Sequence, residues 1–142
     1  MTPFVWKSRI RFVDTDASRR IHYTALFRHF EAAEDEFFRS LGHPYDMESA
    51  EAVYPRVHVQ ADYTAALHYD DPVDIEVRLQ RVGRASYTLA FTLKKNGGEA
   101  ARGLITAACV DPKTQRSREL PADFAALLRR AAGMPLDLPG GA

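Results

Sequence analysis

The sequence lacks a second cysteine and any net charge: Cys109 is its only thiol, and 19 basic side chains balance 19 acidic ones among 142 residues. A single cysteine excludes an intrachain disulfide and a cysteine-based zinc site, and it fits a reducing compartment. A formal charge of zero gives no overall field that would hold a phosphate backbone or an anionic membrane surface. The composition therefore argues against nucleic acid as a partner and favours the cytosol.

Long apolar runs are also missing. Residues 1–12 alternate apolar with basic side chains, whereas a signal peptide or a membrane span needs a continuous apolar core. We therefore expect neither. The chain length suits one domain with a buried core, and we expect that domain over residues 1–133. The remaining residues, 134–142, are rich in Pro and Gly and are predicted to form a flexible tail.

Hydrophobic periodicity predicts one strand and then one long helix in the first third of the chain. In residues 4–12, large apolar side chains stand at even-numbered positions and basic ones at odd-numbered positions. This alternation is typical of a half-buried strand, here one that runs into Asp14. From about Tyr23, apolar residues recur every three or four positions. This spacing is typical of an amphipathic helix, here of about five turns, and Gly42 is expected to end it.

The alternation of apolar and polar side chains that is typical of a strand then recurs in four segments, near residues 57–63, 73–79, 87–93 and 100–110. Asn96-Gly97-Gly98 predicts a hairpin between the last two strands, and Gly103 predicts a bulge in the final one. Pro121 opens a short helix that contains Phe124, Leu127 and Leu128.

This order of elements predicts an α+β fold. Short turns between consecutive strands imply an antiparallel sheet of about five strands, because parallel neighbours need long crossovers. The long helix would lie across one face of that sheet. An open sheet leaves strand edges with unpaired backbone groups, so we expect the chain to dimerise through an edge.

The segment Asp14-Thr15-Asp16 places two carboxylates between the first strand and the long helix. Amides at a helix start lack intrahelical partners and can polarise a carbonyl oxygen. An ionised Asp can attack that carbonyl or deprotonate a water that does. Together these groups meet the needs of thioester hydrolysis.

The run Asp-Thr-Asp-Ala at 14–17, followed by aromatic residues and by Phe30-Glu31 on the helix, resembles the hot-dog-fold thioesterases of the 4-hydroxybenzoyl-CoA thioesterase and YbgC-like group. The similarity continues in Asp62-Tyr63, Arg84-Ala85-Ser86 and Cys109-Val110-Asp111. It implies an antiparallel sheet wrapped on one central helix. It also implies hydrolysis of an acyl-CoA to a free acid and coenzyme A, with no cofactor besides the coenzyme A of the substrate.

The resemblance assigns roles to particular residues. Asp16 matches the family's catalytic carboxylate, and Tyr23 stands where the family uses a main-chain N–H to polarise the thioester carbonyl. The family builds its site between subunits, which implies a homodimer or a dimer-of-dimers tetramer. Ser86 or Thr88 would then face Asp16 across the interface. The candidate substrate-binding residues are His22, Thr24, Arg84, Ser86 and Thr88.

The chain departs from the family pattern at two places. Many YbgC-like members have glycine after the acidic motif, where this chain has Ser18-Arg19. Many also have a tyrosine-histidine pair before the helix, and here the pair reads His22-Tyr23. Both departures bear on loop shape and on the choice of acyl group.

Other interpretations of the same residues stay open. Asp14-Thr15-Asp16 is also typical of a turn that caps a helix. A magnesium-dependent haloacid dehalogenase phosphatase would need a fully apolar strand, which Arg9 and Arg11 interrupt. A zinc site built on His22 and His29 lacks a third ligand, so we expect no metal.

Two other hot-dog functions are alternatives. A non-catalytic module that binds an acyl thioester would gain nothing from Asp16 near a carbonyl. A dehydratase would use a histidine base in a hydratase-type motif. For coenzyme A phosphates, the candidate cations are Arg81, Arg84, Lys94 and Lys95.

Overall fold

The computed structural model describes residues 3–45 and 51–134. Along the chain its elements are β1 (Phe4–Arg9), a 3-10 turn η1 (Phe12–Asp14), α1 (Leu26–Ser40), β2 (Arg56–Tyr63), β3 (Pro72–Val82), β4 (Ser86–Lys95), β5 (Gly98–Ala108) and α2 (Ala122–Ala131). This is the predicted order of strands and helices. The predicted flexible tail falls outside the described residues from position 135 onward.

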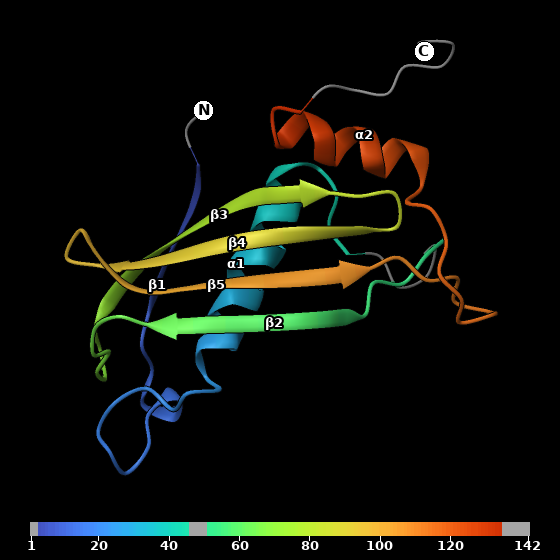
Figure 1. Cartoon of the computed structure of the whole chain (residues 1–142). Coiled ribbons are helices and arrows are strands. Elements are labelled where there is room, and N and C mark those ends of the chain that lie inside the picture. The colour runs from blue at the N-terminus through green and yellow to red at the C-terminus, as the bar shows by residue number, and fades with distance from the viewer. Residues whose placement is uncertain (1–2, 46–50, 135–142) are drawn as a thin grey trace.

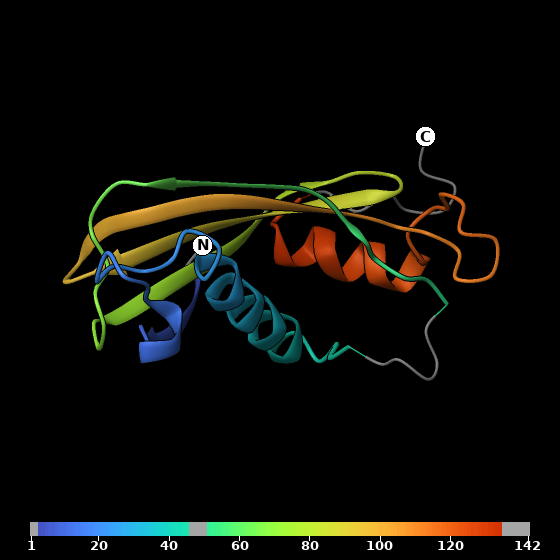
Figure 2. The same cartoon turned by 90° about the horizontal axis from the view of Figure 1, so that it is seen from below.

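The five strands form one antiparallel sheet in the order β1-β3-β4-β5-β2 (Figure 1). Figure 2 shows α1 and α2 on the same side of that sheet. The side chains that α1 buries lie on the face toward the sheet, and the apolar ones are Leu26, Phe30, Ala33 and Phe37. The prediction that the long helix covers one face of the sheet is therefore confirmed.

The hairpin and helix-ending signals are confirmed as well. Asn96 and Gly97 connect β4 to β5 with φ angles of 53° and 81°, the left-handed conformation of a type I′ turn. Gly42 has a φ of 75° just after α1, where a left-handed residue closes the last turn. Pro121 is the N-cap residue of α2.

The first strand is shorter than predicted. β1 ends at Arg9, and the chain then turns through η1 instead of continuing extended to Asp14. The Asp14 carboxylate accepts a hydrogen bond from the Arg11 N–H at 2.7 Å, and such local side-chain bonds compete with strand pairing. As a result Phe12 is 78% exposed instead of buried.

Gly103 does not form the predicted bulge. It stands in regular register opposite Ala61 in β2 and Phe91 in β4. A Cβ atom at this position would lie 2.6 Å from the Phe30 ring and 2.5 Å from the Gln60 carbonyl oxygen. The Phe30 ring cannot yield easily, since it is wholly buried and stacks on Phe91 with centroids 4.5 Å apart. Glycine is needed here because α1 crosses the sheet at very close range.

The edge strand β2 is the most exposed strand of the sheet. It pairs only with β5, and none of its eight residues is buried. Val57 and Val59 are 63% and 50% exposed, so the alternation in this strand does not produce a buried face within one chain. Apolar side chains on an unpaired edge are typical of a surface that another chain covers.

Neither helix in the described part of the chain has the length and apolar character needed to cross a membrane.

Candidate functional site

The segment between β1 and α1 doubles back on itself as a narrow loop. The His22 N–H donates to the Asp14 carbonyl at 2.7 Å, Thr15 pairs with Ile21, and the Asp16 N–H donates to the Arg20 carbonyl at 3.2 Å. Residues 17–19 form the tip. The loop thus keeps Asp16 and the residues just before α1 on two facing arms.

Asp14 is the buried acid of the pair. Its side chain is 4% exposed and accepts hydrogen bonds from the Arg11 N–H at 2.7 Å, from His29 Nε2 at 2.7 Å and from Arg28 Nη2 at 3.1 Å. Burial by itself raises the pKa of Asp14, but these hydrogen bonds outweigh it and hold the pKa below its ordinary value. Three hydrogen bonds and burial hold this carboxylate in place, so it fixes the loop and is not exposed to a substrate.

His29 continues this network toward β1, because its Nδ1 lies 3.1 Å from the Ser8 hydroxyl. The Asp14 carboxylate can only accept, so His29 Nε2 carries the proton of their bond. Sequence reasoning gave His29 no such role. The available signal was its place on the apolar stripe of α1, where a buried histidine needs a buried acceptor.

Asp16 is the exposed acid. Its Oδ1 accepts hydrogen bonds from the Ser18 N–H at 2.8 Å and from the Ser18 hydroxyl, and it forms no ion pair with any residue that the structure describes. The Ser18 hydroxyl and N–H, with a smaller contribution from His22, lower the pKa of Asp16. Asp16 is therefore ionised at neutral pH, with Oδ2 open to solvent or substrate.

The backbone around Tyr23 is held at nearly every polar atom. The His22 and Thr24 N–H groups donate to the Asp14 carbonyl and to His22 Nδ1, and the Ala25 N–H donates to the His22 carbonyl. The Tyr23 carbonyl accepts from the Tyr63 hydroxyl. Within residues 3–45 and 51–134, only the Tyr23 N–H of this group has no acceptor. Its neighbours on both sides are held, so this N–H is a donor in a restrained position.

The prediction that this amide belongs to the first turn of the long helix is wrong. α1 begins at Leu26, and Tyr23 lies in the turn before it. The reason is local, because His22 Nδ1 accepts from the Thr24 N–H at 3.1 Å and lies 2.7 Å from the Thr24 hydroxyl. These contacts favour a turn over a further helical residue. His22 and Thr24 thus shape the turn and remain candidates for substrate contact.

The predicted partners on β4 lie far from this loop within one chain. Tyr63, at the end of β2, contacts Tyr23, whereas Ser86 pairs with Ala108 beyond the start of β2. Figure 1 accordingly shows the loop before α1 and the start of β4 at opposite ends of the sheet. Ser86 is half-buried, while Thr88 is 7% exposed and its hydroxyl lies 2.8 Å from that of Thr106.

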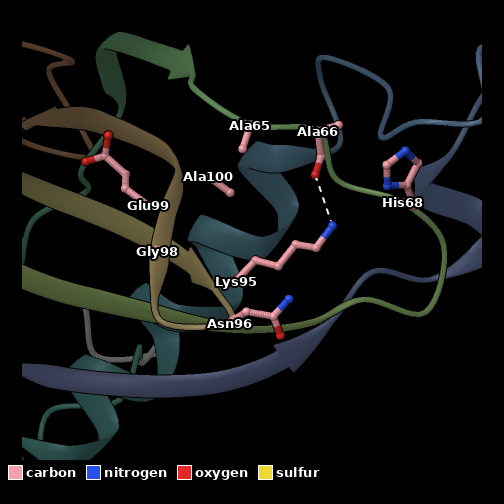
Figure 3. Close-up of a pocket in the computed structure, with 8 residues that line it drawn as sticks. All are labelled: Ala65, Ala66, His68, Lys95, Asn96, Gly98, Glu99 and Ala100. Atoms are coloured by element: carbon pink, nitrogen blue, oxygen red, sulfur yellow. Dashed lines mark hydrogen bonds between the residues drawn. The ribbon is translucent and has the colours of Figure 1, made fainter.

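Three of the four cations proposed for coenzyme A phosphates are already paired with acids. Arg84 pairs with Glu119 at 3.2 Å and Lys94 with Glu76 at 2.9 Å. Lys95 lies in a hollow of about 410 Å³ beside the β4–β5 turn, where its Nζ donates to the Ala66 carbonyl at 3.3 Å (Figure 3). Lys95 also pairs with Asp71 at 2.8 Å. The fourth, Arg81, lies 3.5 Å from the Ser86 hydroxyl.

A larger groove of about 1350 Å³ is bounded by α1, the edge strand β2, and α2. Its aromatic end contains Tyr54, Tyr87 and Phe124, with the Tyr54 and Phe124 ring centroids 5.2 Å apart. The groove also contains the buried Glu34, which pairs with Arg56. Burial raises the pKa of Glu34 although Arg56 acts in the opposite direction. Asp16 lines neither of these two hollows in the described chain.

An antiparallel five-stranded sheet that packs on one long helix is the arrangement of a hot-dog protein, and the loop before α1 adds an exposed carboxylate and an amide with no acceptor among the described residues. The chain belongs to the thioesterase-like superfamily, whose family model matches residues 10–128. The predicted hot-dog fold is therefore confirmed.

Known proteins agree with this assignment. A protein of Aquifex aeolicus (strain VF5) that is named as an esterase is 32% identical over 94 residues, 66% of this chain and 73% of that protein. A 1,4-dihydroxy-2-naphthoyl-CoA hydrolase of Prochlorococcus marinus (strain MIT 9313) is 29% identical over 133 residues, 85% of this chain and 88% of its own. A crystal structure from Aquifex aeolicus matches with a TM-score of 0.83 at 27% identity and covers 89% of this chain and 99% of its own.

Proposed function

We propose that the chain is an acyl-CoA thioesterase that hydrolyses its substrate to a free acid and coenzyme A, with Asp16 as the catalytic carboxylate. The observation that carries this proposal is the loop before α1, which holds an ionised, exposed Asp16 and the unpartnered Tyr23 N–H on facing arms. Relatives that are named as hydrolases of CoA thioesters support it.

In this mechanism the Tyr23 N–H donates to the thioester carbonyl oxygen and stabilises the negative charge that develops there. Asp16 Oδ2 either attacks the carbonyl carbon, giving an anhydride that water then opens, or removes a proton from a water that attacks. In both routes the carbon–sulfur bond breaks and coenzyme A leaves as the thiolate. The Ser18 bonds to Oδ1 orient the carboxylate and keep it ionised.

We further propose that the working site lies between two copies of the chain joined through β2. If β2 pairs antiparallel with β2 of a second copy, the end of each strand lies beside the start of the other. The Tyr23 loop of one copy, which is tied to the end of β2, then approaches the start of β4 in its partner. This arrangement would bring Asp16 of one copy toward Ser86 of the other. Within one chain these two residues lie at opposite ends of the sheet.

The same arrangement suggests an aromatic acyl group. Tyr87 lines the aromatic end of the groove at the start of β4, on the face of the strand opposite to Ser86, and the partner's loop would arrive at this end of the strand. Flat rings stack well on such a surface, and the Prochlorococcus relative is named for a naphthoyl thioester. A 4-hydroxybenzoyl group is also a flat ring and meets the same description.

Thiol release from a panel of acyl-CoA substrates tests the function. We expect 1,4-dihydroxy-2-naphthoyl-CoA and 4-hydroxybenzoyl-CoA to show a kcat/KM at least about tenfold above hexanoyl-CoA, since loss of ring contacts costs on the order of 1 kcal/mol or more. Tight binding of every substrate without thiol release would instead favour the non-catalytic acyl-thioester-binding module.

The β2 edge gives a second test. Val59→Asp places a charge on the exposed apolar edge and is expected to convert the dimer to a monomer, measured by analytical ultracentrifugation, with loss of thiol release. Val5→Asp on the opposite edge strand β1 is the matched control, because Val5 is similarly exposed at 42%. A Val59→Asp protein that stays dimeric and active would show that the subunits do not meet through β2.

A further inference from the structure

Tyr63 connects the edge of the sheet to the loop before α1. It is the last residue of β2, where it pairs with Ala101 of β5. Its hydroxyl donates a hydrogen bond to the carbonyl of Tyr23, which lies 40 residues earlier in the chain. Burial raises the pKa of Tyr63, so the hydroxyl keeps the proton that it donates. The contact therefore fastens the turn before α1 to a strand of the sheet.

This contact restrains one particular peptide unit. The Tyr23 carbonyl and the Thr24 N–H belong to the same planar peptide, and the Thr24 N–H donates to His22 Nδ1. On the other side, the His22 N–H is held by the Asp14 carbonyl at 2.7 Å and the His22 carbonyl by the Ala25 N–H at 2.9 Å. Without the Tyr63 bond, the peptide after the Tyr23 amide would keep, among the described residues, only its contact with the half-buried His22 ring.

Precise placement matters more for this amide than for most. A donor stabilises an oxyanion only when it lies within hydrogen-bond distance of the position that the oxygen occupies in the transition state. A donor that is already fixed needs no reorganisation during the reaction, whereas a mobile one loses part of its effect.

We propose that Tyr63 is a positioning residue for the Tyr23 amide and that it links the β2 edge to the chemistry of the loop. This inference rests on the proposed thioesterase function, which gives the Tyr23 N–H its role. It assigns to an edge-strand side chain a part in setting kcat. It also predicts that pairing of β2 with a second copy, by ordering the end of the strand, steadies the amide before substrate arrives.

Tyr63→Phe removes only the hydroxyl and tests this inference. The ring stays in place, and we expect the melting temperature and the dimer to change little. The kcat for thiol release should fall about tenfold with KM within about twofold of wild type, as for loss of an interaction that acts in the transition state. Tyr69→Phe is the matched control, since Tyr69 is exposed and its hydroxyl has no hydrogen-bond partner among the described residues.

A second measurement does not depend on turnover. Hydrogen exchange at the Thr24 amide, followed by NMR, should be several-fold faster in Tyr63→Phe than in wild type, because this amide shares a peptide with the Tyr23 carbonyl. If wild type releases no thiol, the proposed function fails, and the exchange rate still decides whether Tyr63 holds the peptide. Unchanged exchange, or an active wild type whose kcat survives Tyr63→Phe, would overturn the inference.

Discussion

Replacing Asp16 by asparagine is expected to lower kcat for thiol release by about 10²- to 10⁴-fold, the range found for loss of a catalytic acid or base. The amide has the same shape and keeps an oxygen that can accept the Ser18 hydrogen bonds. It can neither attack a carbonyl nor take a proton from water. KM should change by less than about threefold, because the lost interaction belongs to the transition state. Steady-state kinetics on the best substrate of the panel measures both constants.

Asp111→Asn is the matched control for this substitution. Asp111 accepts the N–H groups of Lys113 and Thr114 in the same kind of local turn, and these bonds likewise lower its pKa. The control should retain wild-type turnover. Because the pKa of Asp16 is also lowered, the fall of wild-type kcat/KM in acid should have its midpoint below the ordinary carboxyl value of about 4. Full turnover in Asp16→Asn would remove Asp16 from the mechanism.

The regular elements could be predicted because each depends on a local pattern. Apolar residues recur at two spacings in the sequence. In a strand every second side chain faces the core, and in a helix every third or fourth does. Turn residues added the remaining information, since Asn96-Gly97 and Gly42 adopt conformations that few other residues tolerate.

The loop details could not be predicted in this way. The Asp14–His29 bond joins residues 15 positions apart, and the Tyr63–Tyr23 bond joins residues 40 apart. Whether such partners meet depends on how the helix lies on the sheet, which no local period specifies. The sequence identified two carboxylates. Only the three-dimensional contacts show that Asp14 is buried and hydrogen-bonded, while Asp16 is exposed to solvent. Gly103 is a similar case, since its need for a glycine comes from Phe30 on another element.

In the proposed dimer, each copy supplies a part of the site that the other copy lacks. In the proposed mechanism the loop supplies a nucleophile or base and one donor, but Tyr87 of the aromatic end of the groove stands at the start of β4, at the other end of the sheet. A two-fold pairing through β2 is a simple operation that brings these two ends together. The exposed valines of β2 and the separation of Asp16 from Ser86 therefore have one common explanation in the proposed dimer.

Asparagine at position 14 is expected to destabilise the fold by about 2–4 kcal/mol, measured as the free energy of unfolding in urea at pH 7. The neutral side chain cannot accept from Arg11, Arg28 and His29 together, and His29 is left buried beside a weaker acceptor. Removing one partner of a buried charged network has costs of this size. The Arg28 side chain is 59% exposed and is stabilised by water, so it contributes the smaller part of the loss.

The pH dependence of this loss distinguishes the charge of Asp14 from its shape. The pKa of Asp14 is lowered in the folded protein, so its stabilising contribution is complete above the ordinary carboxyl value of about 4 and disappears as the pH falls through the lowered pKa. The difference between wild type and Asp14→Asn should therefore be constant from pH 7 to about pH 5 and should narrow in stronger acid. Glu76→Gln, which breaks a partly exposed ion pair with Lys94, should cost less than about 1 kcal/mol. A stability difference that persists undiminished at pH 2 would mean that packing, and not the charge of Asp14, holds the loop.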